Sequence, residues 1–541
     1  MIKCHTFFCK LFTVASVLLM VVSSGHAAEW QWSVTVNGVV SIETKDHPTA
    51  FLWIPPNCKQ VRGVVVGQHN MLEEGILEHA AFRKTMTKLG FAEIWITPGL
   101  DMIFKFQSGK VFDDMMKSLA QKSGYSELEF APIVPVGHSA AASYPWNFGA
   151  WNPKRTLAML SIHGDAPLTN LTGSGQPNPD WDDRNIDGIP GLMVMGEYEW
   201  WEDRITPAIK YKKLHPNAVI AYLADAGFGH FDYSDELVDF LGMFLTKVAA
   251  ARLPAKAPLD RPVPLKSLIP EKGWLVDKWR KDEPLKAAAA PYHKYEGDKG
   301  EAGWALDAGM AKATEDYYAR ARGKQMQYIG YMQQGKLLKP SGFSGFNPKF
   351  IPEADGISFH LSAVYLDSAG GRPILSNHSG AKINISRICG PIRKVDDTTF
   401  KVAFYRIGFN NPKRSNDVWL MAKSVGDEKY KSAVQQADMR IPLKNTSGQE
   451  QHISFPVIPA QKAGVKSMAL AGVSDAGMPV EYYVKKGPAE IMGNRIVFTK
   501  IPPRSAFPIK VTIVAWQYGR GVPPLIKTAE PVEQSFEIDE F

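Results

Sequence analysis

Ser139 stands in the stretch of this chain that is best suited to chemistry. The apolar residues 133–136, Ile-Val-Pro-Val, run directly into Gly137-His138-Ser139-Ala140-Ala141. A serine hydroxyl attacks a carbonyl when a sharp turn exposes it, a base takes its proton and backbone N–H groups hold the oxyanion. A strand followed by Gly-x-Ser-x-Ala therefore predicts a nucleophile elbow. Because so short a motif also arises by chance, an ordinary serine in a strand-to-helix turn is the alternative, and the choice depends on partners downstream.

A carboxylate and a histidine follow two later apolar segments. Glu197 and Glu199 come after residues 191–195, and His230 lies in a glycine-rich run after residues 218–223. A serine needs a histidine to take its proton and a carboxylate to hold that histidine in the required tautomer. Loops at the carboxyl ends of neighbouring strands can bring the three together. We expect Glu199 to orient His230. Three other acids crowd the same loop and stay open as alternatives: Glu197, Glu202 and Asp203.

The elements that must position these residues follow from the apolar pattern of residues 28–252. Antiparallel edge strands are expected within residues 30–54, where apolar residues alternate. After them, apolar strands alternate with amphipathic helices, which predicts a parallel sheet covered by helices on both faces. The expected strands cover residues 63–67, 91–96, 133–136, 157–162, 191–195 and 218–223, and a final helix covers residues 234–248.

The chain order Ser139, Glu199, His230, with each residue after its own strand, resembles the α/β-hydrolase superfamily. The resemblance extends from residue 30 to about residue 250 and implies a doubly wound α/β-hydrolase domain. It implies Ser139 as the nucleophile, His230 as the general base and then the acid, and Glu199 as the orienting carboxylate.

The same resemblance implies an oxyanion hole built from two backbone N–H groups. One would come from Ala140, and the other from the loop at residues 68–71, for which we assign Asn70. Ala141 departs from the last glycine of the family motif Gly-x-Ser-x-Gly, so less room is left for close approach of the backbone.

Aromatic and histidine side chains in loops at the same edge are candidates for substrate contact. We assign this role to His69, His163, Trp146 and Trp200, and the loops also hold Trp151, Trp181 and Trp201. Indole faces pack well on sugar rings and aromatic esters. For any one of these tryptophans ordinary core packing is the alternative, and for His163 it is a hydrogen-bonded structural role.

Two further regions follow the first domain. Residues 253–341 form a Pro- and Lys-rich connector that continues into expected aromatic helices around Trp274, Trp279 and Trp304. Residues 342–541 carry many short apolar segments separated by Gly, Pro, Asn and Asp, which predicts an all-β, immunoglobulin-like sandwich.

Residues 1–27 have the pattern of a signal peptide. Lys3 and Lys10 precede an apolar run at residues 11–22, and small residues precede a cleavage point after Ala27. The run is short for a bilayer, so we expect export to the periplasm, the cell surface or the medium, with no membrane span in the mature chain. The remaining cysteines, Cys58 and Cys389, are expected as buried thiols, with a bridge between them as the alternative.

Several kinds of function find little support in the sequence. The net charge of +7 is modest for 541 residues and lacks a basic run, which disfavours nucleic-acid binding. The sequence contains no His-Glu-x-x-His, no Cys-x-x-Cys and no Gly-Lys-Ser/Thr, so we expect no metal and no cofactor. The oligomeric state stays open.

These features favour an exported serine esterase that acts on a polysaccharide or oligosaccharide through an acyl-enzyme on Ser139. The chain is similar to bacterial carbohydrate esterases of the pectin type, which implies methyl esters of uronic acids, with acetyl or feruloyl esters as alternatives. Glucuronoyl esterases place an arginine directly after the nucleophile, and Ala140 argues against that subclass. A secreted peptidase or lipase of the same fold, and a non-catalytic polysaccharide-binding protein, are the other hypotheses.

Overall fold

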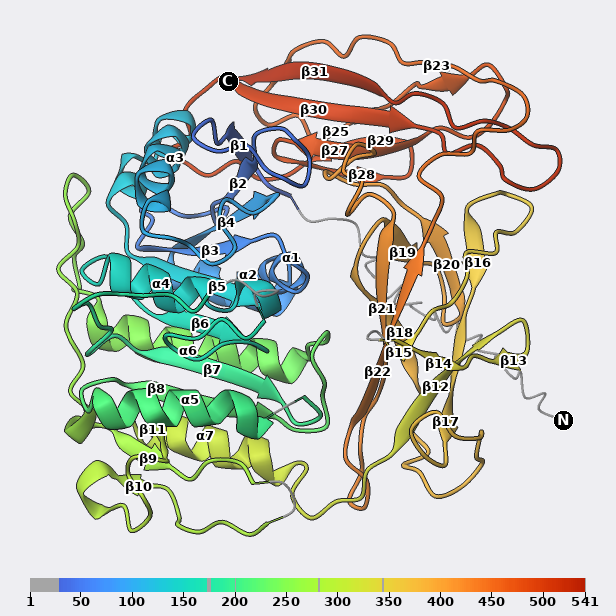
Figure 1. Cartoon of the computed structure of the whole chain (residues 1–541). Coiled ribbons are helices and arrows are strands. Elements are labelled where there is room, and N and C mark those ends of the chain that lie inside the picture. The colour runs from blue at the N-terminus through green and yellow to red at the C-terminus, as the bar shows by residue number, and fades with distance from the viewer. Residues whose placement is uncertain (1–28, 173–176, 200, 281–282, 343–344, 541) are drawn as a thin grey trace, which may run out of the picture.

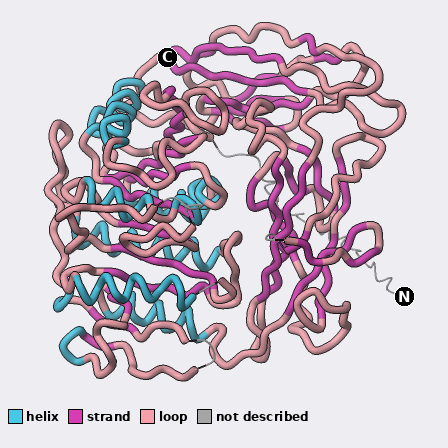
Figure 2. The backbone as a smooth tube through the Cα atoms, viewed as in Figure 1, coloured by secondary structure: helices cyan, strands magenta, loops and turns pink. Residues whose placement is uncertain are grey.

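The computed structural model describes residues 29–172, 177–199, 201–280, 283–342 and 345–540. The helices gather in one half of the molecule, and the other half is built of strands and loops (Figures 1 and 2). The expected signal peptide lies outside the described residues. None of the described helices is long and apolar enough to cross a membrane.

An eight-stranded sheet organises the helical half. Its order is β1-β2-β4-β3-β5-β6-β7-β8; β1, β2 and β4 pair antiparallel, and all later neighbours pair parallel. Because β3 lies between β4 and β5, the chain leaves β3 and β5 in opposite directions, which opens a crevice at their carboxyl ends. The strands are β1 (Trp32–Thr35), β2 (Thr49–Trp53), β3 (Gly63–Gln68), β4 (Phe91–Thr97), β5 (Ile133–His138), β6 (Met159–Ile162), β7 (Gly191–Gly196) and β8 (Ile220–Asp225).

Helices cover both faces of this sheet, as the sequence predicts. On one face Val65 of β3 joins a core that includes apolar residues of α2 and α6, and on the other Val64 and Val66 join a core that includes α3. Successive strand residues point to opposite faces, so a strand buried on both faces must be apolar throughout. The helices are α1 (Glu73–Leu77), α2 (Ala80–Leu89), α3 (Ser108–Ser123), α4 (Tyr144–Trp151), α5 (Trp201–Leu214) and α6 (Asp235–Arg252).

The connector differs from the expectation of aromatic helices. Trp274 and Trp304 lie on strands β9 (Trp274–Val276) and β11 (Gly303–Ala305), which form a small sheet with β10 (Ala290–Pro291). One helix, α7 (Ala308–Ala319), follows and carries no tryptophan. Its Tyr318 hydroxyl donates to the carbonyl oxygen of Tyr222 at 3.0 Å, so this segment packs on the β8 edge of the large sheet. The prediction of tryptophan-bearing helices is therefore wrong, because isolated aromatic residues suit short strands equally well.

Residues 328–539 carry many short strands joined by loops, which confirms the prediction of a strand-rich region. The strands make several small sheets with the orders β13-β12-β17, β14-β15, β16-β20-β19, β18-β21-β22, β23-β26, β24-β31-β30-β27 and β25-β29-β28. The immunoglobulin-like arrangement stays a prediction. The bounds are β12 (Tyr328–Gln333), β13 (Lys336–Leu337), β14 (Pro340–Ser341), β15 (Gly345–Phe346), β16 (Ser358–His360), β17 (Ser362–Leu366), β18 (Asn384–Cys389), β19 (Ile392–Lys394), β20 (Thr399–Val402), β21 (Asp417–Ser424), β22 (Ala433–Arg440), β23 (Ile453–Ser454), β24 (Gln461–Lys462), β25 (Ser467–Ala469), β26 (Val473–Ser474), β27 (Glu481–Lys486), β28 (Ala489–Met492), β29 (Arg495–Phe498), β30 (Ile509–Trp516) and β31 (Val532–Asp539).

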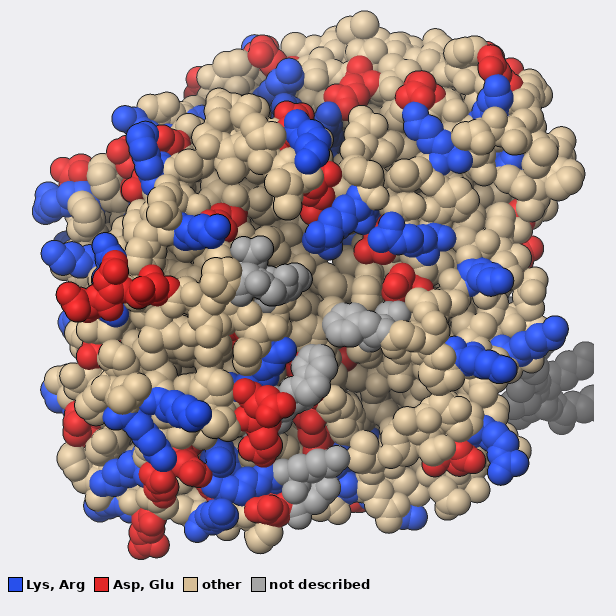
Figure 3. Space-filling model, in the orientation of Figure 1, with Lys and Arg blue, Asp and Glu red and all other residues tan. Residues whose placement is uncertain are grey.

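The strand-rich half packs against the helical half in two places. At one end, residues of β1, β2 and α3 share a hydrophobic core with residues between Ile453 and Ile538. In addition, the carboxyl edge of the large sheet faces β21 and β22 (Figure 1). Basic and acidic side chains are interspersed over the face shown in Figure 3.

The two cysteines retained after the expected signal peptide, Cys58 and Cys389, are both free and buried. This confirms the expectation of two thiols over the alternative of a bridge.

Candidate active site

The turn after β5 has the backbone geometry of a nucleophile elbow. Ser139 has φ of 51°, a left-handed conformation that residues with a side chain rarely adopt. A 3-10 turn over Ser139–Ala141 then leads toward α4. A Cβ atom on Gly137 would lie 1.9 Å from the carbonyl oxygen of Ala141, so only glycine fits there. The turn leaves Ser139 partly exposed at the sheet edge.

Three side chains from three loops form a hydrogen-bonded relay. Ser139 Oγ lies 2.6 Å from His230 Nε2. On the other side of the imidazole ring, Nδ1 of His230 contacts Oε2 of Glu199. When Nδ1–H is donated to Glu199, Nε2 is free to accept the serine proton. The structure thus brings together the three residues predicted as a triad.

Glu199 is held by more than one donor. Its Oε1 accepts a hydrogen bond from the backbone N–H of Gly196 at 2.8 Å and one from His163 Nδ1 at 2.6 Å. Burial alone would raise the pKa of Glu199, but His163 and His230 lower that pKa to about 2. The carboxylate is therefore ionised at neutral pH, as the orienting partner of a histidine base must be.

The other acids of this loop take different positions. Glu202 and Asp203 are exposed on α5. Glu197 is buried and directed elsewhere: its Oε1 lies 2.7 Å from Lys431 Nζ, and its Oε2 accepts the N–H of Gly227 at 2.8 Å. Among the four candidate acids, Glu199 is the one in contact with His230.

His163 does not line a substrate surface, contrary to the expectation. Its side chain is fully buried, and its Nδ1 contacts Glu199. The residue follows β6 directly, with φ of 47°, and this turn directs the ring behind the triad acid. His163 instead supports the carboxylate that supports His230.

The predicted oxyanion loop holds its backbone N–H groups in internal hydrogen bonds. The N–H of Asn70 donates to Oε2 of Glu73 at 3.3 Å, and the N–H of Met71 donates to the same oxygen at 2.9 Å. In this arrangement the Asn70 N–H is directed to Glu73, and its assignment as an oxyanion donor stays a prediction. Its side-chain amide instead donates to the carbonyl oxygen of His138 at 2.8 Å. Ala140 remains at the elbow, partly exposed beside Ser139.

Glu73 ties this loop to the nucleophile elbow, a role that the sequence analysis did not anticipate. Its Oε1 accepts the N–H of His138 at 2.7 Å, and its Oε2 accepts the two N–H groups of Asn70 and Met71. The side chain is fully buried, and burial raises its pKa to about 7 although these N–H groups lower it. The only sequence signal was an acid in the first turn of a helix, which is common and unspecific.

The structure buries most of the described aromatic and histidine side chains that were expected to contact substrate. Trp146 is fully buried, and its Nε1 donates to the carbonyl oxygen of Asp165 at 2.7 Å, so the indole belongs to the core. Trp181 is also buried and donates to Asn147 Oδ1. His69 is buried against Trp95, with Nδ1 at 2.8 Å from Thr97 Oγ1. Trp200 lies outside the described residues, and Trp151 is half-buried among aromatic side chains.

Residues from the strand-rich half reach the same edge. Lys431 pairs with Glu197, and Arg414 Nη1 donates to the carbonyl oxygen of Asn70 at 2.8 Å. The rings of Trp419 and Phe231 pack with centroids 4.7 Å apart. These contacts join the acid loop, the oxyanion loop and the histidine loop to residues about 200 to 350 positions away in sequence, which no local pattern could predict.

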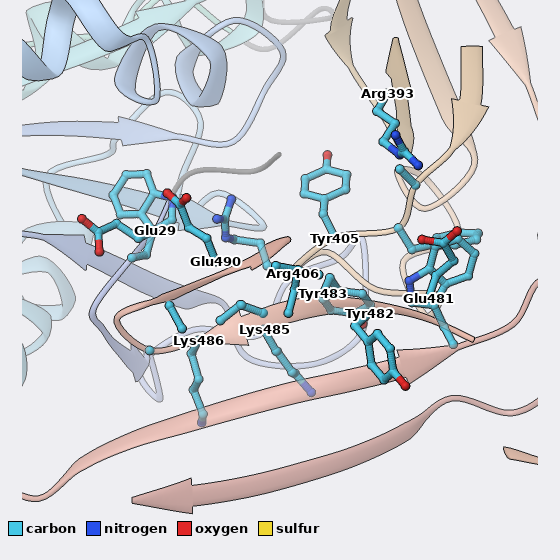
Figure 4. Close-up of a pocket in the computed structure, with 18 of the residues that line it drawn as sticks. Glu29, Arg393, Tyr405, Arg406, Glu481, Tyr482, Tyr483, Lys485, Lys486 and Glu490 are labelled. Atoms are coloured by element: carbon cyan, nitrogen blue, oxygen red, sulfur yellow. The ribbon is translucent and has the colours of Figure 1, made fainter. Parts of the chain in front are cut away.

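A cavity of about 340 Å³ lies between the two halves, apart from the triad. Figure 4 shows charged and aromatic side chains around it, including Glu29, Arg406, Tyr405 and Glu490. None of the triad residues lines this cavity. Its polar lining includes both acidic and basic groups, so charge alone does not identify an occupant.

A scan against protein-family models finds no match, and a search of curated proteins finds none either. Solved structures that are similar include FphF, a fluorophosphonate-binding serine hydrolase of Staphylococcus aureus, with 12% identity, 40% of this chain and 97% of that chain covered, and a TM-score of 0.29. Est1E from Butyrivibrio proteoclasticus has 16% identity, covers 38% of this chain and 95% of that chain, and has a TM-score of 0.26.

An S-formylglutathione hydrolase from Agrobacterium tumefaciens has 13% identity, covers 42% of this chain and 98% of that chain, and has a TM-score of 0.28. The strand order, the strained elbow and the Ser139–His230–Glu199 relay are the features that characterise this domain. These features together describe an α/β-hydrolase-like domain.

Proposed function

We propose that this protein is a serine ester hydrolase that forms an acyl-enzyme on Ser139. The single observation that carries the proposal is the 2.6 Å contact between Ser139 Oγ and His230 Nε2, with Glu199 at the opposite ring nitrogen. This arrangement lets His230 take the serine proton as the oxygen attacks an ester carbonyl. The ionised Glu199 stabilises the imidazolium that forms, and His230 then returns the proton to the leaving alcohol.

Water then hydrolyses the acyl-enzyme by the same route in reverse. His230 takes a proton from water, which attacks the acyl carbonyl, and gives that proton to Ser139 Oγ as it leaves. The N–H of Ala140 is our candidate for one oxyanion donor. A second donor from residues 69–71 requires those N–H groups to leave their present acceptors, so substrate binding would have to move this loop.

The substrate that we propose is an ester on an acidic polysaccharide, with the methyl ester of a uronic acid first and acetyl or feruloyl esters next. Support comes from the positive net charge and from the sequence pattern of a signal peptide, which suits export. Trp146 is buried and is therefore not one of the indole faces that could pack on a sugar ring of the substrate. A peptidase or lipase is the alternative within the same mechanism, and a polysaccharide-binding protein is the alternative without it.

The mechanism is tested by labelling with a fluorophosphonate probe. Wild type should be labelled and Ser139→Ala should not, whereas Ser143→Ala should be labelled as wild type is. Ser143 is a suitable control because it is a buried serine four residues further along the chain. Labelling that survives in Ser139→Ala would contradict the assignment of Ser139 as the nucleophile, and absence of labelling in wild type would contradict the proposal and favour the binding protein.

The substrate is tested by product analysis on methyl-esterified pectin, acetylated xylan, a feruloylated oligosaccharide and a short-peptide panel. Methanol release from pectin that is lost in Ser139→Ala supports the uronate methyl ester. Release of acetate or ferulate would support the same mechanism and identify an acetyl or feruloyl ester as the substrate. Faster cleavage of peptides than of esters would favour a peptidase.

A further inference from the structure

A second cluster of functional side chains lies directly behind the triad acid. It contains His163 after β6, Asp225 at the end of β8 and Asp232 in the loop before α6. All three are 0% exposed. Each residue can place one ligand atom within 4.8 Å of the ligand atoms of the other two.

Each side chain of this cluster has one polar atom with a partner. His163 Nδ1 contacts Glu199 Oε1 at 2.6 Å, Asp225 Oδ1 accepts from the Tyr317 hydroxyl at 2.5 Å, and Asp232 Oδ2 accepts from the Gly229 N–H at 3.1 Å. The second polar atom of each has no hydrogen-bond partner within the described part of the chain: His163 Nε2, Asp225 Oδ2 and Asp232 Oδ1. When His163 donates its Nδ1 proton to Glu199 and its Nε2 carries no proton, Nε2 is a lone-pair donor, so a cation that binds here displaces the Nε2 proton of the imidazolium form.

Three unpartnered lone-pair atoms in a site closed to solvent need an occupant that can satisfy all of them. Burying polar atoms without a partner is unfavourable, and buried carboxylates are paired or bind metal ions. A proton shared in this cluster bridges two atoms and leaves the third. A water molecule has two protons for three acceptors, so it satisfies all three atoms only together with one further proton on the cluster. A divalent cation accepts lone pairs from all three and also balances the two aspartate charges.

We propose that His163 Nε2, Asp225 Oδ2 and Asp232 Oδ1 bind one divalent transition-metal ion of the Zn²⁺ class. One imidazole nitrogen and two carboxylate oxygens form a mixed donor set that suits zinc. Glu199 completes the arrangement, because a metal-bound histidine usually donates its other ring N–H to a carboxylate. His163 would then link the metal to the acid that orients His230.

The proposed metal is structural rather than catalytic. All three ligands are 0% exposed, so a substrate cannot reach the ion, and the ion would act by fixing the position of His163 and therefore of Glu199. Sequence motifs miss such a site because its ligands are spread over 70 residues, with no two on one helix turn. The site does not depend on the proposed ester hydrolysis, since its occupancy is measured without turnover.

The test is the metal content of the purified protein. Wild type is produced in zinc-supplemented medium, purified without chelator and analysed by inductively coupled plasma mass spectrometry beside Asp225→Asn, Asp232→Asn and Glu93→Gln. Glu93 is the control because it is also a fully buried carboxyl, on β4, but lies outside the cluster. Wild type and Glu93→Gln should carry about one metal ion per chain. The metal content of each of the two Asp variants should be lower by about tenfold or more.

A second measurement covers the case in which a variant fails to fold. Wild type from cobalt-supplemented medium should show the visible d–d absorption of Co²⁺ bound by nitrogen and oxygen ligands. Wild type without any stoichiometric divalent metal, and without this absorption, would overturn the proposal and leave a water or a proton in the cluster. Equal metal content in wild type and both Asp variants would overturn it as well.

Discussion

The pair Lys431–Glu197 provides a quantitative test of how the two halves cooperate. Lys431 precedes β22 in the strand-rich half, and its Nζ lies 2.7 Å from Glu197 Oε1. The two side chains are 0% and 1% exposed. Glu197 also accepts the N–H of Gly227 at 2.8 Å, so one carboxylate joins the acid loop to the histidine loop. Replacing Lys431 by Met removes the charge and keeps most of the side-chain volume.

The expected effect follows from the burial of both partners. Removing one member of a buried ion pair leaves a charge without compensation and destabilises a protein by about 3–5 kcal/mol. Glu197 lies two residues before Glu199, and Gly227 lies three residues before His230. A displacement of about 1 Å in such positioning residues lowers activity by about 10²-fold. We therefore expect Lys431→Met to lower both stability and the rate on an activated ester.

The assay combines thermal unfolding with hydrolysis of p-nitrophenyl acetate. The matched control is Lys444→Met, which removes a pair with Glu530 whose side chains are 38% and 80% exposed and should cost less than about 1 kcal/mol. The double variant Lys431→Met/Glu197→Leu should recover much of the lost stability, since a buried pair can be replaced by apolar side chains. Equal unfolding midpoints for Lys431→Met and Lys444→Met would refute the reasoning.

Three further changes test the site itself. Glu199→Gln should lower kcat by about 10⁴-fold with little change in KM, because an amide imposes the wrong tautomer on His230; a loss below tenfold in steady-state kinetics would contradict its role. Gly137→Ala should abolish probe labelling and cost about 1–3 kcal/mol, since its Cβ would overlap the Ala141 carbonyl oxygen; normal labelling and an unchanged unfolding midpoint would argue against the strained turn. Burial raises the pKa of Glu73 from 4.5 to about 7, so its contribution to stability is full below pH 4.5 and is lost as the pH rises to about 7. Glu73→Gln should flatten that part of the stability profile by up to about 3 kcal/mol in unfolding experiments across pH, and an unchanged slope would count against this shift.

The parts of the fold that the sequence predicts are those with strong local patterns. Strands such as 63–67 and 191–195 are apolar throughout because both faces of the sheet are covered, and they lie within β3 and β7. The relay could be predicted for a similar reason. Each of Ser139, Glu199 and His230 follows its own strand, and parallel strands bring their carboxyl ends to one edge.

The features that escaped prediction depend on contacts between distant segments. The burial of Trp146 and the hydrogen bond of the Asn70 N–H to Glu73 depend on tertiary packing. Neither can be predicted from the residue type or its neighbours in the sequence. The role of Glu73 depends on two loops that converge on one carboxylate. The expectation of helices around Trp274 and Trp304 is wrong because short strands accept aromatic residues equally well.

The hydrophobic core shared by the first strands and the last ones has a consequence for how the chain acquires its structure. Residues of β1 and β2 pack with residues between Ile453 and Ile538, and the N–H of Gly487 donates to the carbonyl oxygen of Trp30 at 3.1 Å. These two groups of residues are more than 400 positions apart in the sequence, so the ribosome synthesises the second group long after the first. The outer surface of the first domain therefore stays uncovered until nearly the whole chain has been synthesised, and a nascent chain that stalls earlier presents an apolar face to chaperones and proteases.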